Sequence, residues 1–270
     1  MKFRFLPLIL IVLSVSVMAA EYARAAANPV LIRDTEIEGI IEEWAAPLIS
    51  AAGLPPKSVQ IILVQSPEMN AFVAGGANIF IYTGLIERTD NPGELIGVLA
   101  HELGHIAGGH LIRGRAAMER ASYESILGMI LGVGVAIASG DGGAAAAIGT
   151  GASSIAARRF MAFSRVQESS ADQAALTYMD KAGMDPAGLA SFLGKLESEE
   201  LMPVNQQSEY VRTHPLTANR IGAVETRGRE SASSGKAFPA AWMEQHARMK
   251  AKLAGFIAPQ KVSWIYDDSD

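Results

Sequence analysis

The chain has 270 residues, 49% of them hydrophobic, and carries a formal net charge of −5. This length suits one or two domains, and the composition is sufficient for a buried core. No basic cluster with interleaved aromatic residues occurs, which argues against nucleic acid as a partner. The sequence contains no cysteine, and this excludes a disulfide framework and a lipid-anchored cysteine.

Residues 1–27 have the pattern of a secretory signal peptide. Lys2 and Arg4 give a positive start, an apolar run of 16 residues extends from Phe5 to Ala20, and Ala23-Arg24-Ala25 offers a cleavage site. An exported chain without disulfides fits the periplasm or cell envelope of a bacterium. The alternative is that the segment stays uncleaved and anchors the chain in the inner membrane.

The next part of the chain predicts one helix and two strands. Residues 34–52 have apolar side chains at helical spacing, with Pro47 expected to kink the helix. Residues 59–64 and 77–83 are short apolar runs typical of buried strands. The small residues between them, 70–76, predict a loop.

A second helix is expected between Asn91 and Gly108-Gly109. Asn91 can cap it, Pro92 fits its first turn, and Glu94 occupies the position of a capping-box acid. The two glycines are a plausible stop. This helix carries the sequence His101-Glu102-Leu103-Gly104-His105.

His101 and His105 are four residues apart, so a helix projects both imidazoles from one face. Two neutral nitrogen ligands in this arrangement are typical of a zinc site. Glu102 is offset around the helix and is better placed to take a proton from a water molecule than to bind the metal. The neighbouring residues are almost all apolar, and burying these groups without a metal would cost roughly 2–7 kcal/mol for each uncompensated polar group.

Residues 126–157 are rich in glycine and alanine and almost free of charge. Each apolar half is too short to cross a bilayer comfortably. The pair could form a helical hairpin that packs over the active site or dips into a membrane surface. A mobile Gly/Ala-rich insertion, acting as a flexible lid or plug, is the alternative.

A catalytic zinc ion needs a third protein ligand. His110 is one residue out of register for the third histidine of a metzincin, so we interpret it as a helix-end residue. A helix expected from about Arg158 to Lys181 carries Glu168 and Asp172 on one face, with small neighbours that permit close packing. Glu168 can be the third ligand and Asp172 can orient a ligand histidine, although the spacing alone is also compatible with a surface acid pair.

Further helices are expected after Asp185-Pro186, after Thr213 and around Trp242, Met249 and Leu253. The sequence therefore predicts a signal peptide at 1–27, a zinc metallopeptidase domain at 28–257 that includes the 126–157 insertion, and a C-terminal tail at 258–270.

The three blocks His101–His105, Glu168–Asp172 and Thr213-His214-Pro215 with Arg220-Ile221 resemble the Ste-type CAAX prenyl protease and HtpX-like zinc metalloendopeptidases. Within that family the chain is most similar to the exported BepA-type branch. The resemblance spans roughly residues 30–257. It implies an α+β fold, mostly α-helical, of the zincin (gluzincin) type, with a small β-sheet beside the active-site helix. BepA-type proteins continue into a C-terminal array of tetratricopeptide repeats, and no such repeat is found up to Asp270.

The resemblance also implies roles for individual residues. His101, His105 and Glu168 would hold one Zn²⁺, Glu102 would be the catalytic base, and Asp172 would orient a ligand. His214 would approach the zinc and either restrain activity as a latch or stabilise the oxyanion, and a helix-capping role is the alternative. Arg220 would line or support the site.

The function expected from these features is a zinc metalloendopeptidase of the bacterial envelope. It would hydrolyse misfolded or stalled envelope and outer-membrane proteins, with the outer-membrane assembly machinery as a possible partner. A strand near the active-site helix would bind substrate as an added strand. The alternatives are a periplasmic chaperone or assembly factor with minor peptidase activity, whose apolar hairpin binds unfolded clients, and a zinc hydrolase of small substrates.

Overall fold

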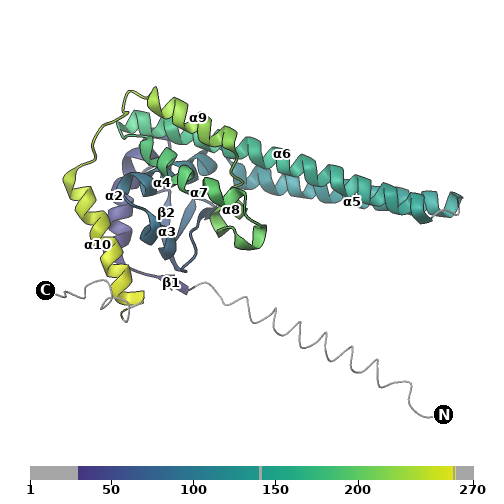
Figure 1. The fold of residues 1–270 in the computed structure, drawn as a ribbon, viewed down its shortest axis with the longest axis horizontal. Helices are drawn as coiled ribbons and strands as arrows, with labels where there is room; N and C mark the ends of the chain where they lie inside the picture. Colours follow the sequence, from purple (N-terminus) through teal and green to yellow (C-terminus); the bar gives the residue numbers. More distant parts are fainter. Residues whose placement is uncertain (1–29, 140–141, 258, 260–270) are drawn as a thin grey trace, which may run out of the picture.

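The computed structural model describes residues 30–139, 142–257 and 259, and shows helices packed around one small sheet, with a long helical hairpin projecting from this body (Figure 1). The predicted α+β, mostly helical, zincin-type fold is confirmed. The predicted signal peptide and nearly all of the predicted C-terminal tail lie outside the described residues.

The sheet has four strands in the order β1-β2-β4-β3. Strands β2 and β4 are parallel, and the other two pairs are antiparallel. The strands are β1 Val30–Ile32, β2 Gln60–Gln65, β3 Ala71–Ala74 and β4 Asn78–Tyr82.

The predicted loop at 70–76 is wrong in part, because four of its residues form β3. Gly75 and Gly76, both at positive φ, make the tight turn that returns the chain as β4. The strand predicted at 77–83 is therefore central, and the free edge near the active-site helix belongs to β3 instead. Small residues predicted a loop here because a four-residue strand contains too little alternation to recognise.

Helix α2, Thr35–Ala51, begins where predicted, because the Asp34 side chain accepts hydrogen bonds from the backbone N–H groups of Glu36 and Ile37. Its apolar face is fully buried, with Trp44 at its centre. The short helix α3, Thr83–Arg88, follows β4 directly.

Helix α4, Pro92–Ala107, is the centre of the molecule. Asn91 caps it as predicted, by accepting a hydrogen bond from the backbone of Glu94. Every residue from Pro92 to Gly104 is buried. Gly109, at φ 63°, ends the helical path and allows a new helix to start in another direction.

The next two helices are much longer than predicted. Helix α5 runs from His110 to Ser139 and α6 from Gly142 to Ala182, so the hairpin at 126–157 is only the outer part of one continuous pair. The helix expected to begin near Arg158 is a later part of α6. Glycine and alanine did not interrupt these helices because they form the close contact between them. A Cβ added to Gly128 would collide with the Cβ of Ala152.

The remaining helices cover α4 and α6. They are α7 Ala187–Glu200, the 3₁₀ helix η1 Val204–Gln206, α8 Glu209–Thr213, α9 Ala218–Arg229 and α10 Ala240–Ile257. No single helix in the described part of the chain has the length and apolarity of a membrane span, whereas the bent pair Pro92–Ala107 and His110–Leu131 passes that test of length and composition together.

Glycines on α4 let two neighbouring helices approach its backbone. A Cβ at Gly97 would lie 2.7 Å from the Cα of Leu189 on α7, and a Cβ at Gly104 would lie 2.7 Å from the carbonyl oxygen of Ala171 on α6. The second contact places the Glu168–Asp172 turn of α6 directly beside the histidines of α4.

We predict that Gly97→Ala lowers the free energy of unfolding by about 1–3 kcal/mol, because the added methyl group has no room against the α7 backbone. Gly39→Ala is the matched control, since Gly39 is exposed on α2 and nothing lies within 4 Å of an added Cβ. This control is expected to gain about 0.5–1 kcal/mol from helix propensity. Urea unfolding of both variants tests the contact, and equal stability of the two would contradict it.

Candidate metal centre and active site

The structure brings all of the predicted site residues into one cluster at the centre of the molecule. Helix α4 supplies the two histidines and Glu102, α6 supplies the two predicted acids, the turn after α8 supplies His214, and α9 supplies Arg220. All are buried except His105, which is partly exposed.

Three side chains converge at the spacing of metal ligands. The Nε2 atoms of His101 and His105 are 3.0 Å apart, and the two oxygens of Glu168 face one each, with Oε2 3.4 Å from His101 Nε2 and Oε1 3.4 Å from His105 Nε2. Bonds of about 2.0–2.1 Å to a tetrahedral zinc ion place neighbouring ligand atoms about 3.3 Å apart. The donor set and its spacing therefore fit a zinc ion, and His214 lies within the same group of potential ligands.

Asp172 fixes the orientation of His101. Its Oδ1 lies 2.9 Å from His101 Nδ1, and its two oxygens accept hydrogen bonds of 2.7 and 2.9 Å from Arg220. Burial alone would raise the pKa of Asp172, but the hydrogen bonds from Arg220 and His101 outweigh it and lower that pKa. Because the carboxylate can only accept, His101 donates from Nδ1 and turns the lone pair of Nε2 toward the cluster.

The acids make this cluster favourable for positive charge. Burial acts to lower the pKa of His101, yet the hydrogen bonds to Asp172 and Glu168 raise it to about 10. Burial would likewise raise the pKa of Glu168, but the neighbouring His214 and His101 hold it well below its usual range. A cation bound here must compete with protons for the same imidazole nitrogens.

His214 connects the cluster to the sheet. Its Nε2 lies 3.2 Å from the carbonyl oxygen of Ala71 at the start of β3, and a carbonyl can only accept. Nε2 therefore donates to this carbonyl, and Nδ1, which lies 3.3 Å from a Glu168 oxygen, faces the ligand group and can donate to that carboxylate. The ring stacks on Tyr210 with centroids 4.6 Å apart.

Glu102 is the one acid of the cluster without a hydrogen bond. Both of its carboxylate oxygens are buried and have no partner among the described residues, and the nearest cationic group is Nε2 of His214 at 3.7 Å. Burial raises the pKa of Glu102. A buried carboxylate with both oxygens free is poised to accept a proton from a water molecule beside it.

A cavity of about 420 Å³ opens on these groups. One side of its wall contains Glu102, His105, Thr213 and His214, and the rest comes from β3 and from the part of the α5–α6 hairpin nearest the body. The residues from these last two sources include Phe72, Val73, Leu111, Met118 and Phe160.

Three groups at the site, His110, Tyr210 and the backbone carbonyl of Ala71, were not predicted from the sequence. His110 is the first residue of α5. Its Nδ1 lies 3.0 Å from Nδ1 of His105. The only sequence signal for this contact was the spacing of five residues between the two histidines. His110 is not part of the metal-ligand group found among the described residues. Tyr210 and the Ala71 carbonyl left no clue, because both meet the site only through the tertiary fold.

We predict that Asp172→Asn weakens zinc affinity by about 10–100-fold, because an amide nitrogen in place of either carboxylate oxygen would face an N–H donor of Arg220 or His101. Competition with a chelator measures the affinity. Glu225→Gln, an acid-to-amide change on the exposed face of α9, is the control and should leave it unchanged. Equal affinities in the two variants would refute the orienting role.

Comparison with known proteins identifies the family of this chain. Residues 32–228 match peptidase family M48. The chain is 28% identical to the β-barrel assembly-enhancing protease of Yersinia pestis over 237 residues, which cover 88% of this chain and 47% of that protein. It is also 28% identical to the protein of the same name from Escherichia coli K12, over 74% of this chain and 40% of that protein.

A shorter relative is the metalloprotease LoiP of Escherichia coli K12, 32% identical over 162 residues that cover 59% of each chain. The chain therefore spans less than half of the length of the two assembly-enhancing proteases and just over half of LoiP. The family match covers most of the chain and includes the helices that supply every residue of the cluster. This chain belongs to peptidase family M48.

Proposed function

We propose that this chain is a zinc-dependent metalloendopeptidase of the bacterial cell envelope. The observation that carries the proposal is the unpartnered carboxylate of Glu102 beside the three converging ligand groups of His101, His105 and Glu168. Two imidazoles and one carboxylate are a ligand set of catalytic zinc sites, in which a further coordination position is left for water or substrate.

The Lewis-acid chemistry that amide hydrolysis needs comes from the bound zinc ion. Glu102 accepts the proton of the attacking water and passes it to the leaving amine. Asp172 and Arg220 hold His101 and Glu168 in place, and they do not touch the substrate. Each of these residues therefore has a role that its present contacts support.

The substrate is an extended polypeptide that lies along β3. In the antiparallel pair with β4, residues 70, 72 and 74 face β4, as the bond from the Tyr82 N–H to the Asn70 carbonyl indicates. The backbone groups of residues 71 and 73 then face away from β4. Because Val73 lines the active-site cavity, its N–H and C=O are available to an added strand, which favours an endopeptidase over a hydrolase of small substrates.

The cellular role we propose is the removal of misfolded or stalled envelope and outer-membrane proteins. Two relatives carry names that refer to β-barrel assembly, and the N-terminal sequence has the pattern of an export signal. The outer-membrane assembly machinery is the partner that these names suggest. We place the enzyme in the periplasm, with residues 28–257 as its peptidase domain.

A chaperone or assembly factor with minor peptidase activity is the second candidate, and the exposed apolar surface of the α5–α6 hairpin favours it. An experiment in vivo distinguishes the chaperone function from the peptidase function. Complementation of a deletion strain by Glu102→Gln would assign the essential role to binding, whereas failure to complement would assign it to cleavage.

We predict that Glu102→Gln binds zinc as the wild type does but cleaves casein at least about 10²-fold more slowly, because the amide cannot accept the proton. Matched metal analysis and casein hydrolysis of both proteins measure this. Substantial turnover by the variant, with zinc in place, would remove Glu102 from the mechanism.

We further propose that His214 is a latch, because its Nδ1 faces the ligand group and its other nitrogen is bonded to the substrate-binding strand through Ala71. His214→Ala is then expected to raise casein hydrolysis several-fold with zinc content unchanged. The double variant with Glu102→Gln, which should stay inactive, controls for a contaminating protease. A collapse of activity in His214→Ala would instead assign oxyanion stabilisation to this histidine.

A further inference from the structure

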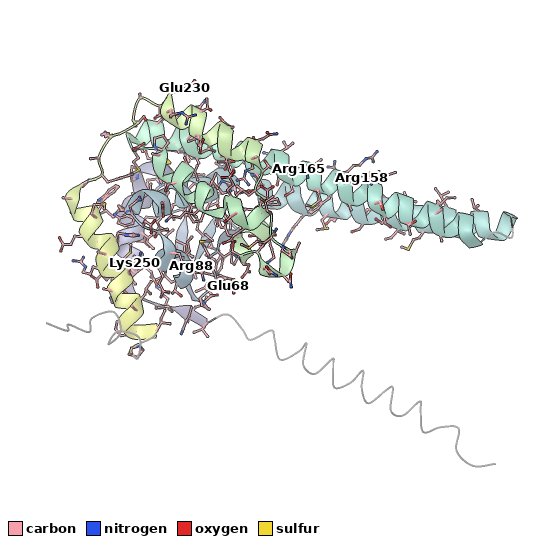
Figure 2. All side chains as sticks on the ribbon, in the orientation of Figure 1. Glu68, Arg88, Arg158, Arg165, Glu230 and Lys250 are labelled. Carbon is pink, nitrogen blue, oxygen red and sulfur yellow. The ribbon has the colours of Figure 1, made fainter. Side chains whose placement is uncertain are left out.

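The part of the α5–α6 hairpin formed by residues 111–166 is here called the arm. Apart from the few side chains that line the cavity, its described residues extend away from the body (Figures 1 and 2). Within it, the segment 126–157 has a single charged residue, Asp141, in the sequence. We call this segment the apolar end.

The packing of the apolar end is inverted relative to that of a water-exposed helical pair. Gly128 and Ala156 are buried between the helices, and Gly128 contacts Ala152 so closely that no Cβ would fit. The large side chains face outward instead, with Ile130 60% exposed and Leu131 64% exposed. Others exposed on the apolar end are Ile126, Leu127, Met129 and Ile155. Small residues between helices and large apolar residues outside are typical of helices that contact lipid.

The charges of the arm lie next to the apolar end, on the side of the body. They comprise six arginines, at positions 113, 115, 120, 158, 159 and 165, and two acids, Glu119 and Glu124. Figure 2 labels Arg158 and Arg165, which lie on this section of α6. One of the six, Arg159, pairs with Glu124 at 2.9 Å. A basic collar on a chain of net charge −5 is complementary to an anionic surface.

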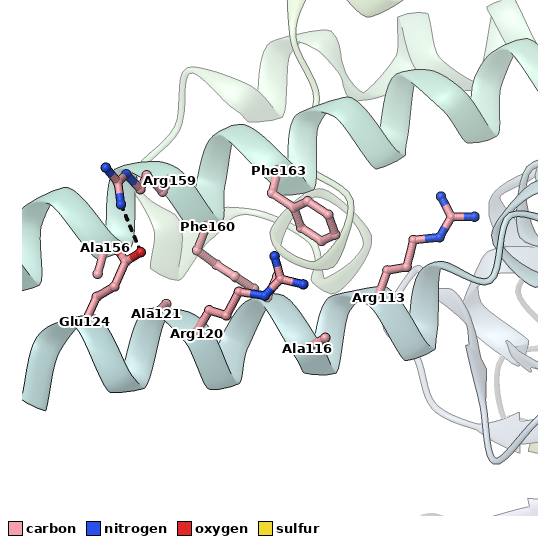
Figure 3. Close-up of a pocket in the computed structure, with 10 residues that line it drawn as sticks. Arg113, Ala116, Arg120, Ala121, Glu124, Ala156, Arg159, Phe160 and Phe163 are labelled. Atoms are coloured by element: carbon pink, nitrogen blue, oxygen red, sulfur yellow. Dashed lines mark hydrogen bonds and ion pairs between the residues drawn. The ribbon is translucent and has the colours of Figure 1, made fainter.

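The collar also contains a pocket of 320 Å³ between the two helices. Arg113 and Arg120 line this pocket together with Phe160 and Phe163 (Figure 3). Arginines next to an apolar floor match the chemistry of a lipid phosphate with its acyl chains, since a guanidinium binds phosphate through two parallel hydrogen bonds.

The apolar end is too short to cross a bilayer, and it fits within one leaflet, about 15 Å of hydrocarbon, when its helices are tilted. From Ile126 to Ser139, 14 residues of α5 extend about 21 Å at 1.5 Å per residue, whereas the hydrocarbon core is about 30 Å thick. Arg120 lies about 9 Å before the first residue of the apolar end. With the apolar end in the hydrocarbon, the collar therefore lies at the depth of the phosphate groups.

We propose that the arm inserts its apolar end into one leaflet of an anionic phospholipid bilayer, with the arginine collar bound to lipid phosphates. This deepens the proposed peptidase function and rests on it, because Met118 and Phe160 of the arm also line the active-site cavity. Met118 is about 12 Å along α5 from the apolar end. The substrates would then be polypeptide segments presented at the surface of that membrane.

The absence of cysteine in the chain permits a site-specific test in the full-length protein. A single cysteine at position 131, from Leu131→Cys, is labelled with the environment-sensitive dye NBD. The control label is placed by Leu201→Cys, on the body, where the side chain is 89% exposed. Because each dye reports only its own surroundings, membrane binding by residues 1–27 does not imitate insertion of the arm.

On addition of vesicles of phosphatidylcholine and phosphatidylglycerol (7:3), the emission at position 131 is expected to shift to the blue and rise at least two-fold, with no change at position 201. Pure phosphatidylcholine vesicles should give a smaller response. Arg113→Glu with Arg120→Glu should reduce the response to anionic vesicles to that level, whereas Arg227→Glu with Arg229→Glu, on the exposed face of α9, should not.

An unchanged spectrum at position 131, or equal changes at both positions, overturns insertion of the arm. A response to unfolded casein without any response to vesicles overturns it in favour of a protein client. Equal responses to neutral and anionic vesicles overturn the role of the collar. Casein hydrolysis by the labelled proteins in the absence of lipid tests the peptidase function separately, so the failure of either proposal is recognised without the other.

Discussion

The guanidinium of Arg220 is the interaction on which the site depends. It donates to both oxygens of Asp172 and to the carbonyl of Pro215, and its Nη1 lies 3.1 Å from Glu168. One side chain of α9 thereby holds two acids of α6 and the turn that carries His214. Burying these charges costs several kcal/mol per ion, which only good geometry and complete hydrogen bonding repay. This explains why an arginine distant in sequence accompanies the metal-ligand motif.

Close contacts between helix backbones permit this geometry. The histidines of α4 can meet Glu168 only because Gly104 leaves room for the α6 backbone at Ala171. A helix that is buried over most of its length has no flexible surroundings into which a larger side chain could move. The orientation of the ligands is thus set by packing as much as by their own hydrogen bonds.

The local parts of the site could be predicted from the sequence, and the long-range parts could not. Helical spacing placed His101, Glu102 and His105 on α4, and the i, i+4 pair Glu168 and Asp172 on α6, because these relations depend on helix geometry alone. Spacing by itself left open whether the acids were a surface pair; the tertiary fold brings them to the histidines. The four-residue strand β3 was missed because so short an element is specified by its pairing with β4 rather than by its own residues.

The arm is a second region whose structure could be predicted only in part from the sequence. Glycine and alanine in residues 126–157 predicted either a hairpin or a mobile insertion, because glycine weakens an isolated helix whereas glycine and alanine together let paired helices approach. The structure shows α6 continuous from Gly142 to Ala182, so Glu168 and the apolar end lie on one helix. A helix is stiff over this length, and a membrane or client that holds its outer end would therefore constrain the position of Glu168 farther along the same helix. Helix α6 therefore contributes both to the apolar end, which is proposed to bind the membrane, and to the cluster around His101 and His105.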